Sequence, residues 1–206
     1  MMKQKVAVFG GTFNPIHLGH LHLCAECQRE YQFQKIILMP DNLPPHKQVQ
    51  QLATAQQRLD MCRLAAEDIP FLEVSDLELR LKGVSYTVQT LRKLTQNFPE
   101  VEWHWIIGSD MLYTFHQWYR YEEILSMAKV VAGAREQAEY DKMLSYREQL
   151  GPLKNRVEII RLAAKPLSST QVRKALETGE PVVRDYLPEQ VFSYIREHGL
   201  YQGKGK

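Results

Sequence analysis

The chain has 206 residues, of which 44% are hydrophobic and 24% are charged. This composition predicts a single globular domain over residues 1–206 that is large enough to bury a substantial core. A formal net charge of +2 gives no general attraction for nucleic acid, so any preference for anions must be local. No secretory hydrophobic region or bilayer-spanning apolar run is present, and we expect a cytoplasmic protein that binds neither nucleic acid nor membrane.

Apolar strand-like runs alternate with helix-like segments along the chain. Continuous apolar runs, typical of strands buried on both faces, occur at 6–9, 35–40, 102–108 and 128–132. Helical patterns occur at 54–69, from about residue 86, at 168–178 and at 188–198. The alternation predicts an α/β fold, a Rossmann-like doubly wound parallel sheet with helices on both faces. A small helical C-terminal part is expected over about 160–200, and residues 201–206 are expected to fray.

The run from 9 to 21, Phe-Gly-Gly-Thr-Phe-Asn-Pro-Ile-His-Leu-Gly-His-Leu, joins the first strand to a helix. Its glycines and proline indicate a tight turn whose backbone N–H groups can approach a ligand closely. His17 and His20 flank Gly19 where the helix begins, a setting that suits a nucleotide polyphosphate. The spacing fits neither G-x-G-x-x-G nor a P-loop. A metal held by the two histidines, or a histidine that only caps the turn, remains an alternative.

Three cysteines, Cys24, Cys27 and Cys62, are too few for a disulfide framework. Cys24 and Cys27 form a C-x-x-C pair close to two histidines, so redox and metal sites both have to be considered. The pair is expected one to two turns inside a helix, away from the N-terminus that would activate a thiol. No second Cys/His pair has zinc-finger spacing, and structural cysteines are favoured.

Polar clusters follow several of the predicted strands, at 10–20, 41–47 and 108–110. Sheets of this class bind ligands at the carboxyl ends of their strands. A further cluster, Ser-Ser-Thr-Gln-Val-Arg at 168–173, places hydroxyls at the start of a helix and Arg173 one turn later. The hydroxyls alone would indicate only an N-cap, whereas Arg173 adds a forked cation suited to phosphate. Two prolines at 44–45 stiffen a loop that carries Lys47, although an exposed lysine is usually only solvated.

These motifs together resemble the nicotinate-mononucleotide adenylyltransferases, within the H-x-G-H nucleotidyltransferase superfamily. The H-x-G-H loop alone indicates only the superfamily, and Ser-Tyr-Thr at 85–87 with Gly108-x-Asp110 and Trp118 points to the nicotinate-mononucleotide branch. The resemblance runs in family order through 10–21, 44–47, 78–80, 83–87, 106–110, Trp118 and 168–173. The charged segment 136–156, which carries no readable chemistry, is interpreted as a family-variable insertion.

The resemblance implies an enzyme of NAD biosynthesis that joins ATP and nicotinate mononucleotide, forming deamido-NAD and releasing pyrophosphate. The attacking phosphate is already an anion, so the reaction needs positioning and charge stabilisation rather than a general base or a covalent intermediate. Mg²⁺ would accompany ATP, held mainly by substrate oxygens and water, with no metal ligands from the protein. The alternatives are a phosphopantetheine adenylyltransferase, a cytidylyltransferase, or a nucleotide-binding module without catalytic activity.

The same resemblance assigns site residues. Three are implied to be catalytic: His17, His20 and Arg173. The ATP site is implied to include, with those three, Gly10, Gly11, Thr12, Phe13, Gly108, Asp110, Ser169 and Thr170. The nicotinate mononucleotide site is implied to include Asn42, Lys47, Ser85, Tyr86, Thr87, Trp118 and Arg135. Trp118 would stack on the pyridine ring and backbone N–H groups near Tyr86 and Thr87 would bind the carboxylate. By residue type alone, Trp118 is equally a core residue and Asp110 a helix cap.

Overall fold

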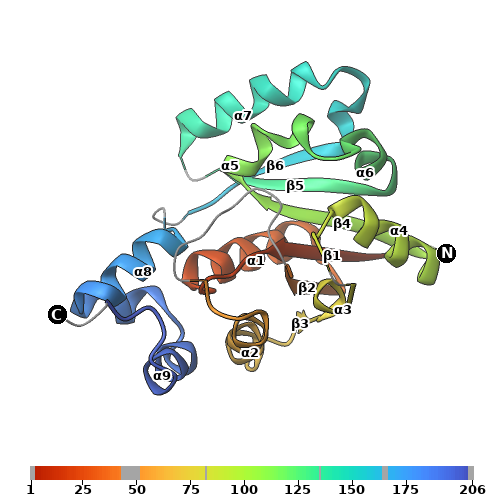
Figure 1. Ribbon diagram of the computed structural model, residues 1–206. Coiled ribbons are helices and arrows are strands. Elements are labelled where there is room, and N and C mark those ends of the chain that lie inside the picture. The colour runs from red at the N-terminus through yellow and green to blue at the C-terminus, as the bar shows by residue number, and fades with distance from the viewer. Residues whose placement is uncertain (1–2, 43–51, 82, 135, 164–166, 204–206) are drawn as a thin grey trace.

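Six parallel strands form one sheet in the computed structural model, which describes residues 3–42, 52–81, 83–134, 136–163 and 167–203 (Figure 1). The strands follow the order β3-β2-β1-β4-β5-β6, and every neighbouring pair is parallel. The order reverses between β1 and β4, which opens a crevice beyond their carboxyl ends. The strands are β1 (Gln4–Gly11), β2 (Lys35–Pro40), β3 (Leu72–Val74), β4 (Val101–Gly108), β5 (Ala128–Ala134) and β6 (Val157–Arg161).

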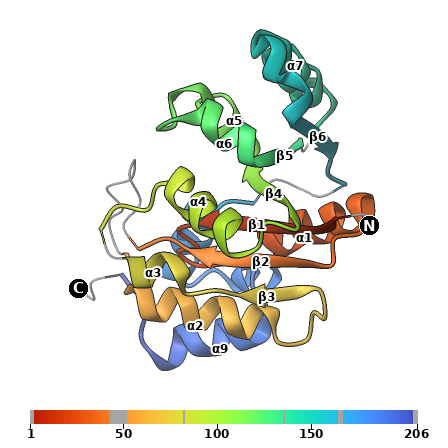
Figure 2. The ribbon, with the colours of Figure 1, turned by 90° about the vertical axis from the view of Figure 1, so that its right-hand side faces the viewer.

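Helices cover both faces of the sheet (Figures 1 and 2). They are α1 (Leu18–Tyr31), α2 (Ala55–Ala66), α3 (Leu77–Leu81), α4 (Thr87–Asn97), α5 (Ser109–Leu112), α6 (Tyr121–Met127), α7 (Gln137–Gln149), α8 (Ser169–Thr178) and α9 (Glu189–Glu197). Short 3₁₀ helices add η1 (Phe115–Gln117), η2 (Gly151–Arg156) and η3 (Pro181–Tyr186). In the described ranges, no helix is both long and apolar enough to cross a membrane.

The side chains of β1 alternate between two separate core clusters. Ala7 and Phe9 pack with α1, α2, α8 and α9 on one face. Val6 and Val8 pack with α4, α5, α6 and α7 on the other. This division follows from the two-residue repeat of a strand and is the property of a doubly wound sheet. The predicted fold class is therefore confirmed.

Two helices begin where the local sequence places their caps. Thr54 Oγ1 accepts from the Gln57 backbone N–H at 3.2 Å, and Gln57 Oε1 accepts from the Thr54 N–H at 2.9 Å. Ser168 and Gln171 form the same reciprocal pair at the start of α8, at 3.3 and 2.8 Å. Both pairs are capping boxes, which satisfy N–H groups that the helix itself leaves open.

The segment 136–156, interpreted as a family-variable insertion, contains α7, the crossover helix between β5 and β6, which buries Met143 against the sheet. One expectation about the second half of the chain is wrong. Tyr201 does not fray, since its ring is 5% exposed and its hydroxyl donates to Asn14 Oδ1 at 2.6 Å. The packing of α8 and α9 on the shared core favours the single domain expected over 1–206, which stays a prediction.

Candidate functional site

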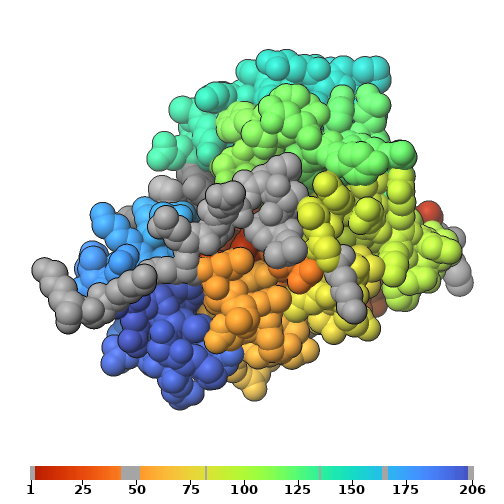
Figure 3. Space-filling view, viewed as in Figure 1, coloured from red at the N-terminus to blue at the C-terminus, as the bar shows by residue number. Residues whose placement is uncertain are grey.

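A cavity of about 960 Å³ lies at the carboxyl ends of the strands, near the upper limit for a small-molecule site. On the face shown in Figure 3, α5 to α7 lie above and α2, α8 and α9 lie below. Most residues assigned by resemblance line this cavity: Gly10, Gly11, Thr12, Phe13, His17, His20, Ser85, Tyr86, Thr87, Gly108, Asp110, Trp118, Ser169, Thr170 and Arg173. Asn42 is described but does not line it, and Lys47 and Arg135 lie outside the described residues.

The two histidines of the loop are stacked, with ring centroids 3.6 Å apart. His17 is the N-cap of α1 and is 3% exposed. Its backbone N–H donates to Nδ1 of His20 at 3.2 Å. Because Nδ1 accepts this bond, it carries no proton, and the proton of the neutral ring lies on Nε2. His20, in the first turn of α1, therefore has a hydrogen-bond donor at a defined position, its Nε2. Its ring packs edge-on against Phe13, with the ring centroids 5.2 Å apart.

The start of α8 is joined to the same loop, although it lies about 150 positions further along the chain. Arg173 Nη1 donates to the Asn14 carbonyl at 2.7 Å, and the Ser169 hydroxyl donates to the Pro15 carbonyl at 3.0 Å. Arg173 Nη2 also donates to Thr170 Oγ1 at 3.2 Å. These bonds place a guanidinium and two hydroxyls on the cavity wall that also carries the histidines. The arrangement offers several donors to one anionic group.

Two glycines let the backbone lie close to its neighbours at the cavity floor. A Cβ at Gly10 would lie 2.7 Å from the Trp105 ring, and one at Gly108 would lie 2.7 Å from Asp110 Oδ1. The alternative role of Asp110 as a helix cap is wrong, because Gly108 is the N-cap of α5 and Asp110 lies in the first turn. The Asp110 carboxylate is thus beside the end of β4, where it can accept from ligand hydroxyls.

The opposite end of the cavity is aromatic. Trp118 is partly exposed: its ring packs against the buried Phe115 at 5.3 Å, at the edge of the core, and it also lines the cavity. Tyr86, the N-cap residue of α4, packs against the exposed Tyr119 at 5.3 Å. The Tyr86 carbonyl accepts from the Gln89 N–H at 2.9 Å, but the Tyr86 side chain makes no capping bond to the first N–H groups of α4. Flat rings beside helical N–H groups suit a planar anion.

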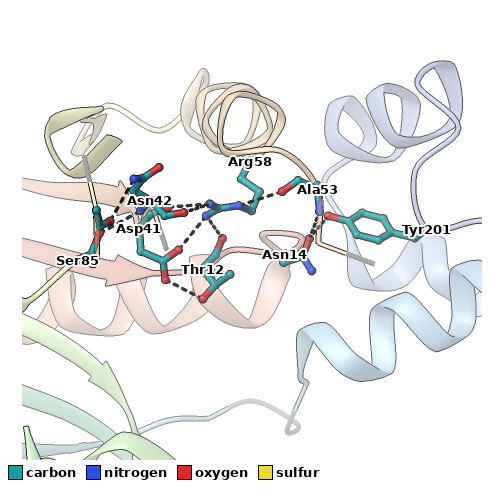
Figure 4. A network of polar contacts seen from close by, with 9 residues as sticks. Thr12, Asn14, Asp41, Asn42, Ala53, Arg58, Ser85 and Tyr201 are labelled. Atoms are coloured by element: carbon teal, nitrogen blue, oxygen red, sulfur yellow. Dashed lines mark hydrogen bonds and ion pairs between the residues drawn. The ribbon is translucent and has the colours of Figure 1, made fainter. Parts of the chain in front are cut away.

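A buried ion pair that the sequence analysis missed, between Arg58 and Asp41, supports the loop after β1 (Figure 4). Arg58 is 1% exposed, and its Nη1 lies 3.1 Å from Asp41 Oδ1. The guanidinium also donates to four backbone carbonyls, those of Thr12, Asp41, Asn42 and Ala53. Thr12 Oγ1 donates to the other carboxylate oxygen of Asp41 at 2.8 Å. Arg58 lies next to Leu59 on the buried face of α2. A cationic residue on an otherwise apolar helix face could have indicated from the sequence that a buried ion pair was present.

Glu78 is a second buried charge that had no role in the sequence analysis. It is 4% exposed, lines the cavity, and accepts from Thr90 Oγ1 at 2.7 Å. Burial raises the pKa of this carboxyl from its ordinary 4.5 to about 7, opposed by hydrogen bonds from Thr90 and Ser85 and assisted by the charge of Asp41. Glu78 thus changes charge near neutral pH.

The cysteines are free and buried, which agrees with the structural role favoured for them. Burial raises the pKa of the Cys24 and Cys62 thiols well above the ordinary value. Such thiols are poor nucleophiles. Within the described ranges, no group of three His, Cys, Asp or Glu residues is arranged to hold a metal ion.

Comparisons with known proteins agree with this geometry. A cytidylyltransferase-like family matches residues 8–175. A probable nicotinate-nucleotide adenylyltransferase of Lachnoclostridium phytofermentans is 37% identical over 199 residues, covering 96% of this chain and 99% of the relative. A protein with the same name from Listeria innocua is 35% identical over 203 residues, covering 98% of this chain and all of the relative.

Solved structures share the fold. The Plasmodium falciparum nicotinic acid mononucleotide adenylyltransferase, complexed with APC in one structure and with NaAD in another, superposes with a TM-score of 0.77 at 16% identity. Each superposition covers 96% of this chain and 97% of the Plasmodium chain. A putative nicotinate-nucleotide adenylyltransferase from Vibrio parahaemolyticus gives a TM-score of 0.68 at 22% identity, with 97% of this chain and 96% of that one covered.

Replacing Arg58 by Ala should lower the free energy of unfolding by about 3–5 kcal/mol, because Asp41 and four carbonyls lose their buried cation. Arg63→Ala is the matched control on the same helix, since Arg63 is 56% exposed and only pairs with Asp60. The control should change stability by less than about 1 kcal/mol. Urea unfolding of both variants measures the difference, and equal effects would refute the role of the buried pair.

Glu78 should make stability depend on pH in a defined window. Its folded-state pKa lies above the unfolded value, so its contribution is present below pH 4.5 and is lost as pH rises to about 7. The shift corresponds to roughly 3 kcal/mol. Unfolding of the native protein and of Glu78→Gln at several pH values should therefore show the variant gaining relative stability across this window. A constant difference would mean that Glu78 does not titrate there.

Proposed function

The chain belongs to the nicotinate-nucleotide adenylyltransferase family, and we propose that it transfers the adenylyl group of ATP to nicotinate mononucleotide, forming deamido-NAD and pyrophosphate. The observation that carries the proposal is the convergence of both histidines, Arg173 and the aromatic end on one cavity. One end supplies donors for a polyphosphate and the other suits a flat anionic ring. The product joins these two kinds of group, and the cavity is continuous between them.

The reaction is an in-line displacement at the α-phosphorus of ATP. A phosphate oxygen of the mononucleotide attacks, and the bond to the pyrophosphate oxygen breaks. His20 donates from Nε2 to the phosphate oxygens as charge shifts onto the leaving group, and it needs no proton transfer to do so. His17 stacks on His20 and keeps its ring in place. The hydrogen bond from His20 becomes stronger as negative charge develops on the phosphate oxygens, and this lowers the barrier without a general base.

Arg173, Ser169 and Thr170 bind the β- and γ-phosphates in this proposal. The guanidinium is already oriented by the Asn14 carbonyl, so little ordering is required when ATP binds. Mg²⁺ would accompany the triphosphate, held mainly by substrate oxygens and water, and would offset part of the triphosphate's negative charge. Gly108 and Asp110 bind a ribose, and Gly10 to Phe13 place backbone N–H groups beside the phosphates.

The acceptor occupies the aromatic end. Trp118 stacks on the pyridine ring, and N–H groups at the start of α4, near Tyr86 and Thr87, bind the nicotinate carboxylate. Ser85 takes part by holding this segment in place, since its hydroxyl is bonded to Glu78 and to the Asn42 N–H. Asn42 is assigned to the mononucleotide phosphate, although its amide donates to the Gly83 carbonyl at 3.1 Å and would have to turn. Lys47 and Arg135 stay predictions for the same phosphate.

The reaction is tested with purified protein, Mg²⁺ and pairs of substrates, with pyrophosphate release and the dinucleotide product as readouts. We expect turnover with ATP and nicotinate mononucleotide. CTP in place of ATP tests the cytidylyltransferase alternative that the family match raises, and phosphopantetheine tests the other acceptor. Turnover only with one of these pairs would contradict the proposal, and no turnover with any pair would indicate a binding module.

Replacing His20 by Asn should lower kcat by roughly 10²–10³ because the Nε2 donor is lost. The Asn side chain retains an acceptor near the position of Nδ1, so the bond to the His17 N–H that starts α1 can persist. His198→Ala is the matched control, since that imidazole stacks on Tyr194 at the end of α9. Steady-state kinetics with a thermal melt measure both. Near-normal kcat in a folded Asn variant would refute the role of His20.

A further inference from the structure

A buried carboxyl group, that of Glu78, borders the acceptor end of the cavity. Glu78 comes from the short helix α3, lines the cavity with Ser85, Tyr86 and Thr87, and is 4% exposed. No Lys or Arg in the described ranges forms an ion pair with it. A carboxylate in this position is expensive to bury, so it needs a structural or functional reason.

Glu78 is bonded to the segment that begins α4. Thr90 Oγ1 donates to Glu78 Oε1 at 2.7 Å, and the Ser85 hydroxyl forms a second hydrogen bond to the same carboxyl. Ser85 Oγ in turn accepts from the Asn42 backbone N–H at 3.0 Å. The chain of bonds therefore runs from the end of β2 through Ser85 to Glu78 and Thr90. It fixes the residues whose N–H groups are assigned to the acceptor's carboxylate.

The charges around Glu78 leave it sensitive to a ligand's charge. Asp41 faces it from the end of β2, and that carboxylate is already bound to Arg58 of α2. On its own helix, Arg80 is 68% exposed and pairs with Asp76. On α4, the hydroxyl of Thr90 is the group bonded to Glu78, while Arg92 is bound to Glu123 of α6. Among the described residues, these three arginines are already paired with carboxylates, so they would not offset a second carboxylate brought near Glu78.

We propose that Glu78 positions the acceptor segment and that its charge state sets the preference for the nicotinate over the nicotinamide acceptor. The inference rests on the proposed function. With Glu78 neutral, the carboxylate of the acceptor meets helical N–H groups and no opposing charge. With Glu78 ionised, two carboxylates lie at one end of the cavity and repel each other. A carboxamide acceptor carries no such charge and is indifferent to this switch.

The direction with pH follows from the carboxyl's environment. Because burial raises the pKa of Glu78 to about 7, both forms are present near neutral pH. The preference for nicotinate mononucleotide should therefore be strongest on the acid side and should decline as pH rises through about 7.

The measurement is the ratio of kcat/KM for nicotinate mononucleotide to that for nicotinamide mononucleotide, from pH 6 to 8.5. Both acceptors carry the same phosphate and react with the same ATP at the same histidines. Any effect of pH on the phosphate, on ATP or on the histidines therefore cancels in the ratio. If nicotinamide mononucleotide is not turned over, its competitive inhibition constant takes its place. The ratio should fall roughly fivefold to tenfold in the native enzyme. In Glu78→Gln it should be flat, because the amide carries no charge.

A second variant moves the transition instead of removing it. Thr90→Val deletes a hydroxyl that stabilises the ionised carboxyl, so the pKa of Glu78 rises and the midpoint shifts to higher pH. Thr95→Val is the matched control on α4, since the Thr95 hydroxyl donates to the Leu91 carbonyl and not to Glu78. The control should leave the midpoint unchanged.

The outcomes separate this inference from the proposed function. Turnover of nicotinate mononucleotide with a ratio that does not change with pH would overturn the inference and leave the function intact. A ratio that still falls in Glu78→Gln, or an equal shift in both threonine variants, would also overturn it. Absence of turnover with nicotinate mononucleotide at every pH would overturn the function and this inference with it.

Discussion

The buried pair of Arg58 and Asp41 is the interaction on which the site depends most. Asp41 follows β2 and Thr12 follows β1, so the two strand ends are held by one guanidinium from α2. A buried arginine is tolerable only when its donors are satisfied, and here a carboxylate and four carbonyls satisfy them. Those carbonyls belong to loops that hydrophobic packing alone would leave free to move. The bonds of this one buried cation thereby fix the positions of Thr12 and Asp41, which line the cavity.

The loop after β1 is supported from the other side by the end of the chain. Asn14 Oδ1 accepts from the Ala53 N–H and from the Tyr201 hydroxyl, while its carbonyl accepts from Arg173. The loop thus receives a bond from Arg173 of α8. It also receives bonds from Ala53, two residues before the start of α2, and from Tyr201 in the C-terminal segment (Figure 4). These bonds hold the loop and α8 together, and the role proposed for Arg173 on the phosphates depends on them. The site is therefore built to position its ligands rather than to activate a nucleophilic or basic side chain.

The two ends of the cavity handle charge differently. The phosphate end offers donors that are present at every physiological pH: backbone N–H groups, hydroxyls and an arginine that stays cationic. The acceptor end combines helical N–H groups with Glu78, whose charge varies near neutrality. Under the proposal made above, the polyphosphate would meet the same donors at every pH, while selectivity for the smaller substrate would vary with the charge of Glu78.

The sequence by itself determined the alternation of buried strands and helices, the capped starts of α2 and α8, and the motifs that became the phosphate end. Each depends on residues within a few positions of one another, where periodicity and capping act directly. It did not indicate β3 or β6, because β3 has three residues and β6 leaves Glu158 and Ile159 partly exposed. Nor did it indicate the bond between Asn14 and Tyr201, which are 187 positions apart. The tertiary structure alone decided which buried charges meet at the cavity, because burial and partner charge depend on contacts between distant segments and not on local pattern.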